Sequence, residues 1–361
     1  MNDKYYIRGF DGLRCISILF VLNEHLKGGN FLKTLFGNDF GGRLFSITSG
    51  GMGVGIFFVL SGYLITTLLL KEKIEFGKIN YKKFIIRRFF RLFPAFSFYM
   101  LITFVVFIIE GRISKHFITG WLIAFFYLYN FVPYGKLRFV EIGHTWSLAV
   151  EEQYYLVWPL LMHFFKKNWI FILILFSIVF TQIFKWWYDT LPISTIYQSY
   201  RLTIPGIYPI LIGCLVAVMS LFSKIYKSNI LLPVSVAMYF SPLFPLYQYF
   251  HFIPYFSYVI YYLPMMGVGI FIYWLVNNNS HVLINIFEFS ILKFIGKLSY
   301  SIYLWQEIFL MGAVHGKESW MQKFPQNILC TFIMASFSYF VIEKRFLKMK
   351  NKYRLVKNLH D

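Results

Sequence analysis

Long apolar blocks recur along the chain, with short polar segments between them. A helix needs about 20 mostly apolar residues to cross a bilayer. Ten blocks are long enough, and they lie at residues 10–27, 52–70, 93–110, 146–165, 169–187, 204–222, 229–248, 254–276, 294–313 and 326–343. An eleventh block, at residues 117–132, is shorter than a full crossing requires. The pattern predicts an all-α fold, a polytopic membrane bundle of about ten transmembrane helices.

The composition supports this prediction and excludes other classes of protein. Hydrophobic residues make up 58% of the chain and charged residues only 14%, whereas about a quarter of a soluble domain is charged. A disordered chain needs low hydrophobicity. Cys15, Cys214 and Cys330 are scattered singly and without metal-ligand spacing, so we expect core residues rather than disulfides or a metal site.

Basic residues are concentrated beside the predicted spans. The 35 Lys and Arg against 16 Asp and Glu give a net charge of +19, which in a soluble protein would suggest nucleic acid. Eight of them fall in residues 71–91 and seven in residues 344–357. Cytoplasmic loops are enriched in Lys and Arg, so we predict both segments and both termini on the cytoplasmic side, and no nucleic-acid partner. This topology requires that residues 117–132 do not cross, and we expect them to be re-entrant or interfacial on the outer side.

The hydrophilic segments are too short to form a soluble core of their own. We therefore expect a single membrane domain over residues 1–345 and a basic cytoplasmic tail at residues 346–361. The first apolar block has no small-residue cleavage site after it, which is typical of an uncleaved signal anchor. No internal repeat and no Gly-rich phosphate loop is visible.

Ionisable residues inside spans are costly and therefore indicate function. The first span carries Arg14 and His25, eleven residues apart. At about 100° per residue they lie within about 20° of three full turns, on one helix face with a rise of about 16 Å between them. Arginine suits a phosphate and histidine suits a general base. The structural alternative is that Arg14 pairs with Asp11 and that His25 lies among headgroups beside Glu24.

The fourth span opens with polar residues that follow His144. Ser147, Glu151 and Tyr155 recur every fourth residue and share one helix face, while Glu152 points about 100° away. A carboxylate at the depth of Glu151 would orient the imidazole of His25 and stabilise its protonated form. An interhelical salt bridge or hydrogen bond is the structural alternative for Glu151.

Two further patterns are weaker by themselves. Arg88 and Arg91, before Pro94, share a helix face at the cytoplasmic surface, an arrangement that suits a polyphosphate. Basic residues flank cytoplasmic span ends in general, however. Ser61, before Gly62, is a possible acyl relay, although a Ser-Gly pair inside a span more often marks a close helix contact.

Taken together, these stretches resemble the acyltransferase 3 family of integral-membrane O-acyltransferases, which includes O-antigen acetylases. Five segments match the family's motifs in order: Phe10–Arg14 with His25, Phe57–Ile65, Arg88 with Arg91, Trp146–Tyr155, and Gly296–Trp305. The last segment departs from the pattern, because the family commonly has histidine where this chain has Gln306. Glutamine keeps hydrogen-bonding capacity but does not transfer protons at neutral pH.

The resemblance implies ten spans, a cytoplasmic acyl-CoA donor and an acceptor sugar hydroxyl reached from the other side. The predicted function is therefore transfer of an acyl group, most commonly acetyl, from acyl-CoA to a surface polysaccharide or lipopolysaccharide in the bacterial inner (cytoplasmic) membrane. Acetyl-CoA would be the donor substrate and no cofactor would be bound permanently. Partners would be the lipid bilayer and a glycan or lipid-linked glycan. Some members carry an extra hydrolase-like domain, for which we expect no room after the tenth span.

In the mechanism that follows from this resemblance, Arg88 and Arg91 hold the CoA phosphates and Arg14 guides the phosphate end or arm of the donor. His25 deprotonates the acceptor hydroxyl with Glu151 as its partner. His144 binds the acceptor sugar, and Ser147, Tyr155 and Ser61 complete the substrate-binding residues. The alternative function is a multi-pass transporter of lipid-linked sugars or small molecules, which would use the same intramembrane residues as a substrate or proton path. A membrane scaffold without catalytic residues is a third possibility.

Overall fold

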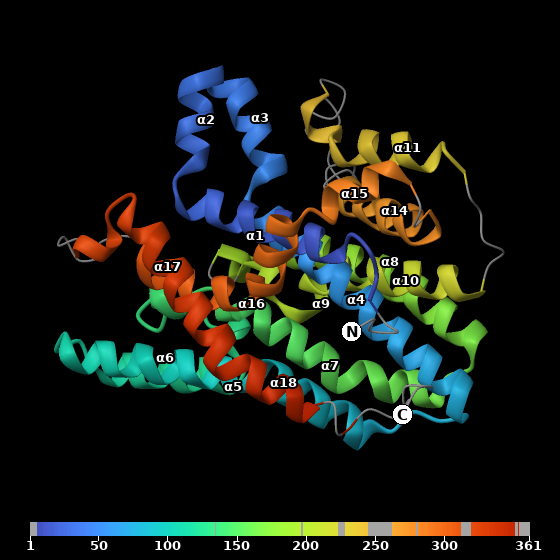
Figure 1. Cartoon of the computed structure of the whole chain (residues 1–361), viewed down its shortest axis with the longest axis horizontal. Helices are drawn as coiled ribbons and strands as arrows, with labels where there is room; N and C mark the ends of the chain where they lie inside the picture. The colour runs from blue at the N-terminus through green and yellow to red at the C-terminus, as the bar shows by residue number, and fades with distance from the viewer. Residues whose placement is uncertain are drawn as a thin grey trace. The chain divides into compact units, whose positions relative to one another are not determined.

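A computed structural model describes residues 6–133, 135–195, 198–222, 228–244, 262–278, 281–311, 319–350 and 353. Every regular element in these ranges is a helix (Figure 1), which confirms the predicted all-α class. The chain forms two compact units, each built from three segments. Unit 1 comprises residues 1–71, 165–191 and 204–297, and unit 2 comprises residues 72–164, 192–203 and 298–361.

Unit 1 contains the first apolar block and most of the middle of the chain. Its helices are α1 (Phe10–His25), α2 (Gly28–Phe36), α3 (Asn38–Thr48), α4 (Gly50–Phe76, up to the unit boundary), α8 (Lys167–Asp189), α9 (Thr203–Gly206), α10 (Tyr208–Phe222), α11 (Leu231–Tyr239), the short 3₁₀ helix η5 (Ser241–Leu243), α14 (Leu263–Asn277) and α15 (Val282–Phe287). Helices α1, α4, α10 and α14 share one core, to which Phe10, Val59, Tyr208, Ile272 and Trp274 contribute buried side chains.

Glycines let α4 and α10 approach each other closely within unit 1. A Cβ atom added to Gly62 would lie 2.0 Å from the backbone oxygen of Ile210, and one added to Gly213 would lie 2.1 Å from that of Val59. Small residues at helix contacts allow this kind of backbone approach in membrane bundles. The expectation of a close helix contact at the Ser61–Gly62 pair is confirmed at Gly62.

The segment before α1 is attached to α15 through Glu288. The carboxylate of Glu288 accepts hydrogen bonds from the hydroxyl of Tyr6 (2.8 Å) and the backbone N–H of Gly9 (2.6 Å), and it forms an ion pair with Lys293 (3.3 Å). Burial opposes ionisation of this carboxyl, but these donors outweigh burial and lower the pKa of Glu288 below its ordinary value. Arg8 adds a hydrogen bond to Asn285 of α15 (2.8 Å).

Unit 2 contains most of the basic segment, the polar start of the fourth block, and the C-terminal helices. Its elements are α5 (Tyr81–Ile109), α6 (Lys115–Phe125), η1 (Tyr129–Phe131), η2 (Val140–Ile142), α7 (Thr145–Phe164), η3 (Pro192–Thr195), η4 (Ser199–Arg201), α16 (Ser290–Leu310, from residue 298), η6 (Trp320–Gln322), α17 (Gln326–Phe337), the π-helix η7 (Ser338–Glu343) and α18 (Lys344–Lys350). Helix α6 packs on α5 through stacked rings of Phe107 and Phe117, whose centroids are 3.8 Å apart.

Each of the ten apolar blocks contains a helix, and four helices in the described residues are long and apolar enough to cross a membrane. They are Asn38–Phe76, Tyr81–Ile109, Asn168–Asp189 and Gln326–Met349. Helices α10 and α14 are apolar but shorter. The chain is therefore built of membrane-type helices, while the count of ten crossings and the cytoplasmic termini stay predictions. Parts of three predicted segments, residues 245–248, 254–261 and most of 346–361, lie outside the described residues.

The basic segment at residues 71–91 is mostly helical, so its prediction as a loop was wrong. Helix α4 continues to Phe76 and α5 already begins at Tyr81. The side chain of Asn80 caps α5 by accepting a hydrogen bond from the backbone N–H of Lys83 (3.0 Å). Apolar patterning does not detect these extensions of α4 and α5, because the residues that form them include many basic side chains.

The short block at residues 117–132 is α-helical only as far as Phe125, and the three-residue 3₁₀ helix η1 follows within it. Ser114 caps α6, and Tyr127, which follows the helix, adopts a positive φ of 57°. Eleven helical residues span about 16 Å, about half the hydrocarbon thickness of a bilayer. Its length agrees with the prediction that this block does not cross, and its location on the outer side stays a prediction.

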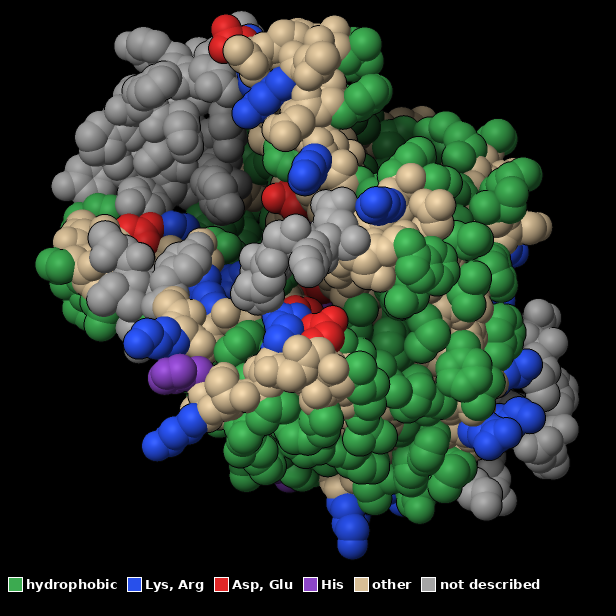
Figure 2. Space-filling model, turned by 90° about the vertical axis from the view of Figure 1, so that its left-hand side faces the viewer, with side chains coloured by type: hydrophobic (Ala, Val, Ile, Leu, Met, Phe, Trp, Pro, Cys, Tyr) green, Lys and Arg blue, Asp and Glu red, His purple; other side chains and the backbone are tan. Residues whose placement is uncertain are grey.

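Large apolar side chains are exposed along the described helices. In unit 2 they include Leu101, Ile108, Leu122, Ile333 and Phe337, from α5, α6 and α17. Figure 2 shows hydrophobic side chains gathered over a wide area of one face with few charges among them. A soluble monomer rarely exposes so much contiguous apolar surface, so this surface suits contact with lipid.

Candidate active site

A buried histidine–carboxylate pair lies at the start of α7 in unit 2. The ring Nδ1 of His144 is 2.9 Å from Oε2 of Glu307 on α16, and the backbone N–H of His144 donates to the same oxygen (3.0 Å). His144 is 3% exposed and Glu307 7%. With Glu307 ionised, its carboxylate only accepts hydrogen bonds, so Nδ1 of a neutral His144 carries the hydrogen and Nε2 keeps a lone pair.

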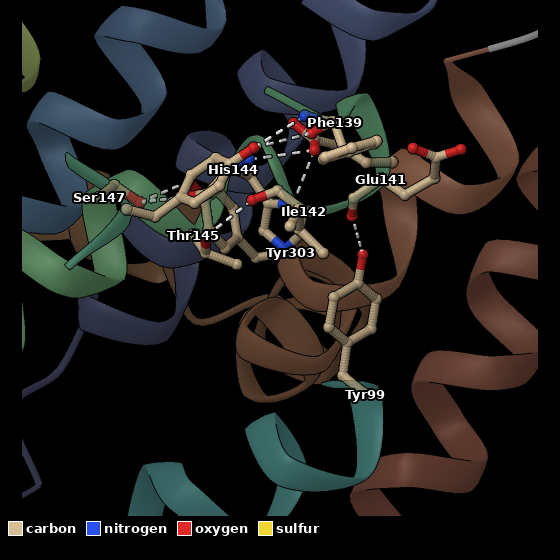
Figure 3. A network of polar contacts seen from close by, with 10 residues as sticks. Tyr99, Phe139, Glu141, Ile142, His144, Thr145, Ser147 and Tyr303 are labelled. Carbon is tan, nitrogen blue, oxygen red and sulfur yellow. Dashed lines mark hydrogen bonds and ion pairs between the residues drawn. The ribbon is translucent and has the colours of Figure 1, made fainter. Parts of the chain in front are cut away.

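Hydroxyl groups form hydrogen bonds with the backbone at and near this histidine (Figure 3). Ser147 and Tyr303 lie 2.6 Å apart at their oxygens, and each is 3.1 Å from the carbonyl oxygen of His144. Tyr303 and Glu307 are four residues apart on α16 and so face the same way. The hydroxyl of Tyr99 on α5 donates to the carbonyl of Glu141, a few residues before His144.

Aromatic rings enclose the imidazole. The rings of Tyr99 and Tyr303 meet it edge to face, with centroids 5.3 and 5.2 Å away. The ring of Trp305 packs on Tyr99 at 5.3 Å. Among the described residues, neither Nε2 of His144 nor Nε1 of Trp305 has a hydrogen-bond partner, although both are buried. A buried polar atom without a partner costs about 1–3 kcal/mol, and such atoms in native proteins call for a functional explanation.

The predicted polar face of α7 is present on one continuous helix. It carries Ser147, Glu151 and Tyr155, as the spacing predicted. The structure also brings Tyr155 together with Arg88 of α5, whose guanidinium carbon lies 5.3 Å from the centre of the tyrosine ring. Glu152 is close enough to Arg88 to interact with it electrostatically.

The two predicted phosphate-binding arginines lie one turn apart on α5. Neither Arg88 nor Arg91 forms a hydrogen bond or ion pair with another residue in the described part of the chain. Their neighbour Arg87, in contrast, forms an ion pair with Glu72 (3.0 Å) and a hydrogen bond to the backbone oxygen of Tyr353 (3.2 Å). The donors of Arg88 and Arg91 are therefore available to a ligand, whereas those of Arg87 hold the protein together.

The remaining predicted site residues belong to unit 1. Arg14 and His25 lie on α1, which is helical from end to end, so they share a face as expected. Arg14 forms an ion pair with Asp11 (2.9 Å), as the structural alternative for this residue predicted. Ser61 is half-buried on α4 beside the Gly62 contact. Since Glu151 lies in unit 2, its pairing with His25 stays a prediction.

Sequence reasoning missed Glu307, Tyr303 and Tyr99. Tyr303 lies inside one of the motif segments, and Glu307 comes directly after the atypical Gln306. A signal was present, since a tyrosine and a glutamate four residues apart inside an apolar span place two polar groups on one face. Their common partner, His144, is more than 150 residues away in sequence, so the pattern alone could not select it.

Comparison with known proteins decides the family. A family model described as an acyltransferase domain, that of acyltransferase 3, matches residues 7–343. The chain belongs to the acyltransferase 3 family. The match begins just before α1 and ends at Glu343, so it includes every candidate site residue in both units. The resemblance inferred from five short motifs is thereby confirmed.

Relatives in this family include peptidoglycan O-acetyltransferases. The chain is 29% identical to peptidoglycan O-acetyltransferase OatA of Listeria monocytogenes, over 94% of this chain and 56% of the relative. It is 27% identical to the putative peptidoglycan O-acetyltransferase YrhL of Bacillus subtilis, over 94% of this chain and 54% of the relative. A putative O-acetyltransferase of Staphylococcus aureus is 36% identical over 44% of this chain and 25% of the relative. The chain thus spans about half the length, or less, of these relatives, and no solved structure matches it.

Proposed function

We propose that the chain is a membrane O-acetyltransferase that transfers an acetyl group to a sugar hydroxyl of bacterial cell-wall glycan. The observation that carries this proposal is the family match over residues 7–343. The names of two relatives specify peptidoglycan, which narrows the acceptor from the broader expectation of a surface polysaccharide or lipopolysaccharide. Residues 1–345 act as one membrane domain in the bacterial cytoplasmic membrane, with both termini in the cytoplasm. A reporter fusion that places residue 345 outside would contradict this topology.

The donor we propose is acetyl-CoA on the cytoplasmic side. Arg88 and Arg91 are its phosphate ligands, supported by their shared face on α5 and by the availability of their guanidinium donors. The sequence-based assignment also gives Arg14 a role in guiding the phosphate end or arm of the donor. This assignment agrees with the high density of positive charge in residues 71–91, which attracts an anionic donor.

The transfer needs a group that accepts the hydroxyl proton. The sequence-based assignment gives this role to His25, with Glu151 as its partner, and gives the binding of the acceptor to His144, Ser147, Tyr155 and Ser61. Support for the acceptor-binding set comes from the buried contact network of His144 and Ser147. His144 is also a competing candidate for the proton, because it already has a carboxylate partner.

The test of the function uses intact cells. Base-labile acetate is measured on peptidoglycan isolated from a host that lacks O-acetylation, with and without expression of this chain. Acetate on the glycan only in expressing cells supports the function. Unmodified glycan at normal membrane levels of the protein refutes it, and export of an unacetylated lipid-linked sugar would indicate the transporter instead. In the same assay His25→Ala should abolish acetylation, and full activity of that variant would remove His25 from the mechanism.

The donor site is tested with membrane vesicles and labelled acetyl-CoA. Replacing Arg88 and Arg91 together by alanine should raise the KM for acetyl-CoA at least about tenfold with a smaller change in kcat, since a phosphate clamp acts mainly through binding. Lys82→Ala, an exposed basic change on the same helix, is the matched control. An equal KM in the double variant and the control would show that the arginines only set topology.

A further inference from the structure

His144 has the arrangement of a general base rather than of a structural histidine. Its Nδ1 is held by the carboxylate of Glu307 at 2.9 Å, which fixes the tautomer, and its Nε2 has no partner among the described residues. A histidine with one nitrogen oriented by a carboxylate and a lone pair on the other is what proton abstraction from a hydroxyl requires. A histidine that only ties α7 to α16 would gain by having both nitrogens satisfied.

The surroundings keep this imidazole in one orientation. The backbone N–H of His144 donates to the same carboxylate oxygen (3.0 Å), so Glu307 holds the residue at two points. The rings of Tyr99 on α5 and Tyr303 on α16 meet the imidazole edge to face. The hydroxyls of Tyr303 and Ser147 fix its carbonyl. A base held this firmly is pre-organised, so little reorientation is needed when the proton moves.

The location suits the acceptor rather than the donor. His144 directly precedes α7, and Glu307 lies in the last turn of α16. The predicted topology puts both the start of α7 and the C-terminal end of α16 on the outer side. Nε1 of Trp305, a buried donor without a hydrogen-bond partner among the described residues, lies in the same aromatic cluster.

We propose that His144, rather than His25, is the catalytic residue that accepts the proton of the attacking sugar hydroxyl, and that Glu307 is its positioning residue. The inference rests on the proposed function. The hydroxyl proton moves to Nε2, the oxygen forms an ester bond with the acyl carbon, and the bond from that carbon to the thioester sulfur breaks. The proton on Nε2 then passes to the departing thiolate, which leaves His144 neutral again. Because Nε2 is enclosed, the hydroxyl reaches it only after neighbouring side chains move.

The proposal predicts a particular pH dependence. The titratable groups that face the imidazole are Glu307 and Tyr303 of α16 and Tyr99 of α5, and Glu141 precedes it in the same segment. Two other charges are nearby: Arg112 forms an ion pair with Glu141 (2.7 Å), and the guanidinium of Arg201 in η4 lies over the ring of Trp146 (5.5 Å). Activity requires neutral His144, so kcat falls on the acid side. A neighbouring carboxylate favours the protonated imidazole, and its removal must move the acid limb to lower pH.

The experiment measures acetyl transfer from labelled acetyl-CoA to muropeptides from digested peptidoglycan, in vesicles containing the full chain. Rates are normalised to the amount of protein in the membrane. His144→Gln should lower kcat by about 10² or more, the usual contribution of a general base. Glu307→Gln should lower kcat and shift the acid limb to lower pH, and Glu307→Asp should restore part of both. His163→Gln, an exposed change on the same helix, is the matched control and should behave as wild type.

Two results would overturn the proposal. The first is a normal kcat and an unchanged acid limb in His144→Gln or Glu307→Gln. The second is a loss confined to the amount of protein in the membrane, with a normal rate per molecule, which would make the pair structural. A failure of the proposed function can be told apart from a failure of this proposal. The function requires that the wild-type chain acetylates glycan, whereas the role of His144 is judged only on variants of an active protein.

Discussion

Replacing Gly62 with alanine tests the contact between α4 and α10 that holds unit 1 together. The added Cβ would lie 2.0 Å from the backbone oxygen of Ile210, and the contact is reciprocal, because a Cβ on Gly213 would lie 2.1 Å from the oxygen of Val59. Backbone atoms cannot rotate away as the end of a flexible side chain can. The helices themselves must therefore separate.

The size of the effect follows from this geometry. Real Cβ atoms are essentially never found closer than 3.0 Å to another heavy atom, so the change from 2.0 Å requires a separation of about 1 Å. Overpacking of this kind costs about 1–3 kcal/mol, and alanine recovers up to about 1 kcal/mol through its higher helix propensity. Separation also loosens the buried side chains of Tyr63 and Tyr208 on either side of the contact. We expect a net loss of about 1–2 kcal/mol in the free energy of unfolding.

The assay is thermal unfolding of the purified full chain in detergent. The matched control is Gly51→Ala on the same helix, where the added Cβ would meet only the hydroxyl oxygen of Ser49, at 3.8 Å. Both variants gain the same helix propensity, but only Gly62→Ala creates the clash. We expect a lower Tm for Gly62→Ala and an equal or higher Tm for Gly51→Ala. Equal Tm values for the two variants would refute the close approach of α4 and α10.

Two other predictions concern packing and charge. Glu288→Gln should lower stability by about 1 kcal/mol at pH 7 by weakening the charge-assisted hydrogen bond from Gly9. The folded-state pKa of Glu288 is lowered, so its contribution is present above the ordinary pKa of about 4.3 and is lost as pH falls through the folded-state pKa. A difference in Tm from wild type that does not shrink as pH is lowered would contradict this. Phe117→Ala should cost about 3–5 kcal/mol, because the ring is fully buried and stacked on Phe107. In the same thermal assay the neighbouring exposed Ile118→Ala should change stability by less than about 0.5 kcal/mol, and equal losses in the two variants would disprove the packing of α6.

Local structure was predictable where it depends on composition and failed where it depends on single side chains. Every apolar block contains a helix, because the apolar character of a segment is a property of its own residues. The ends were predicted less well. Asn80 and Ser114 cap α5 and α6 through hydrogen bonds that apolar patterning does not detect, so α5 begins a dozen residues before the apolar block that marks it.

The candidate site shows the same division. The shared faces of Arg14 with His25, and of Ser147 with Glu151 and Tyr155, follow from helical periodicity alone. Each of the two sets lies on one continuous helix. Periodicity relates residues within one helix and says nothing about partners on another. The approach of Tyr155 to Arg88 therefore came from the structure.

The sequence by itself determined that this is a helical membrane protein of the acyltransferase 3 family, because span-length apolar blocks and short motifs are contiguous in the chain. Only the tertiary structure decided which histidine has a carboxylate partner. His144 and Glu307 are separated by 163 positions and meet through the packing of α7 against α16. The contacts that join these segments, such as that between Ser147 and Tyr303, connect residues more than 150 positions apart, so no local pattern encodes the pair.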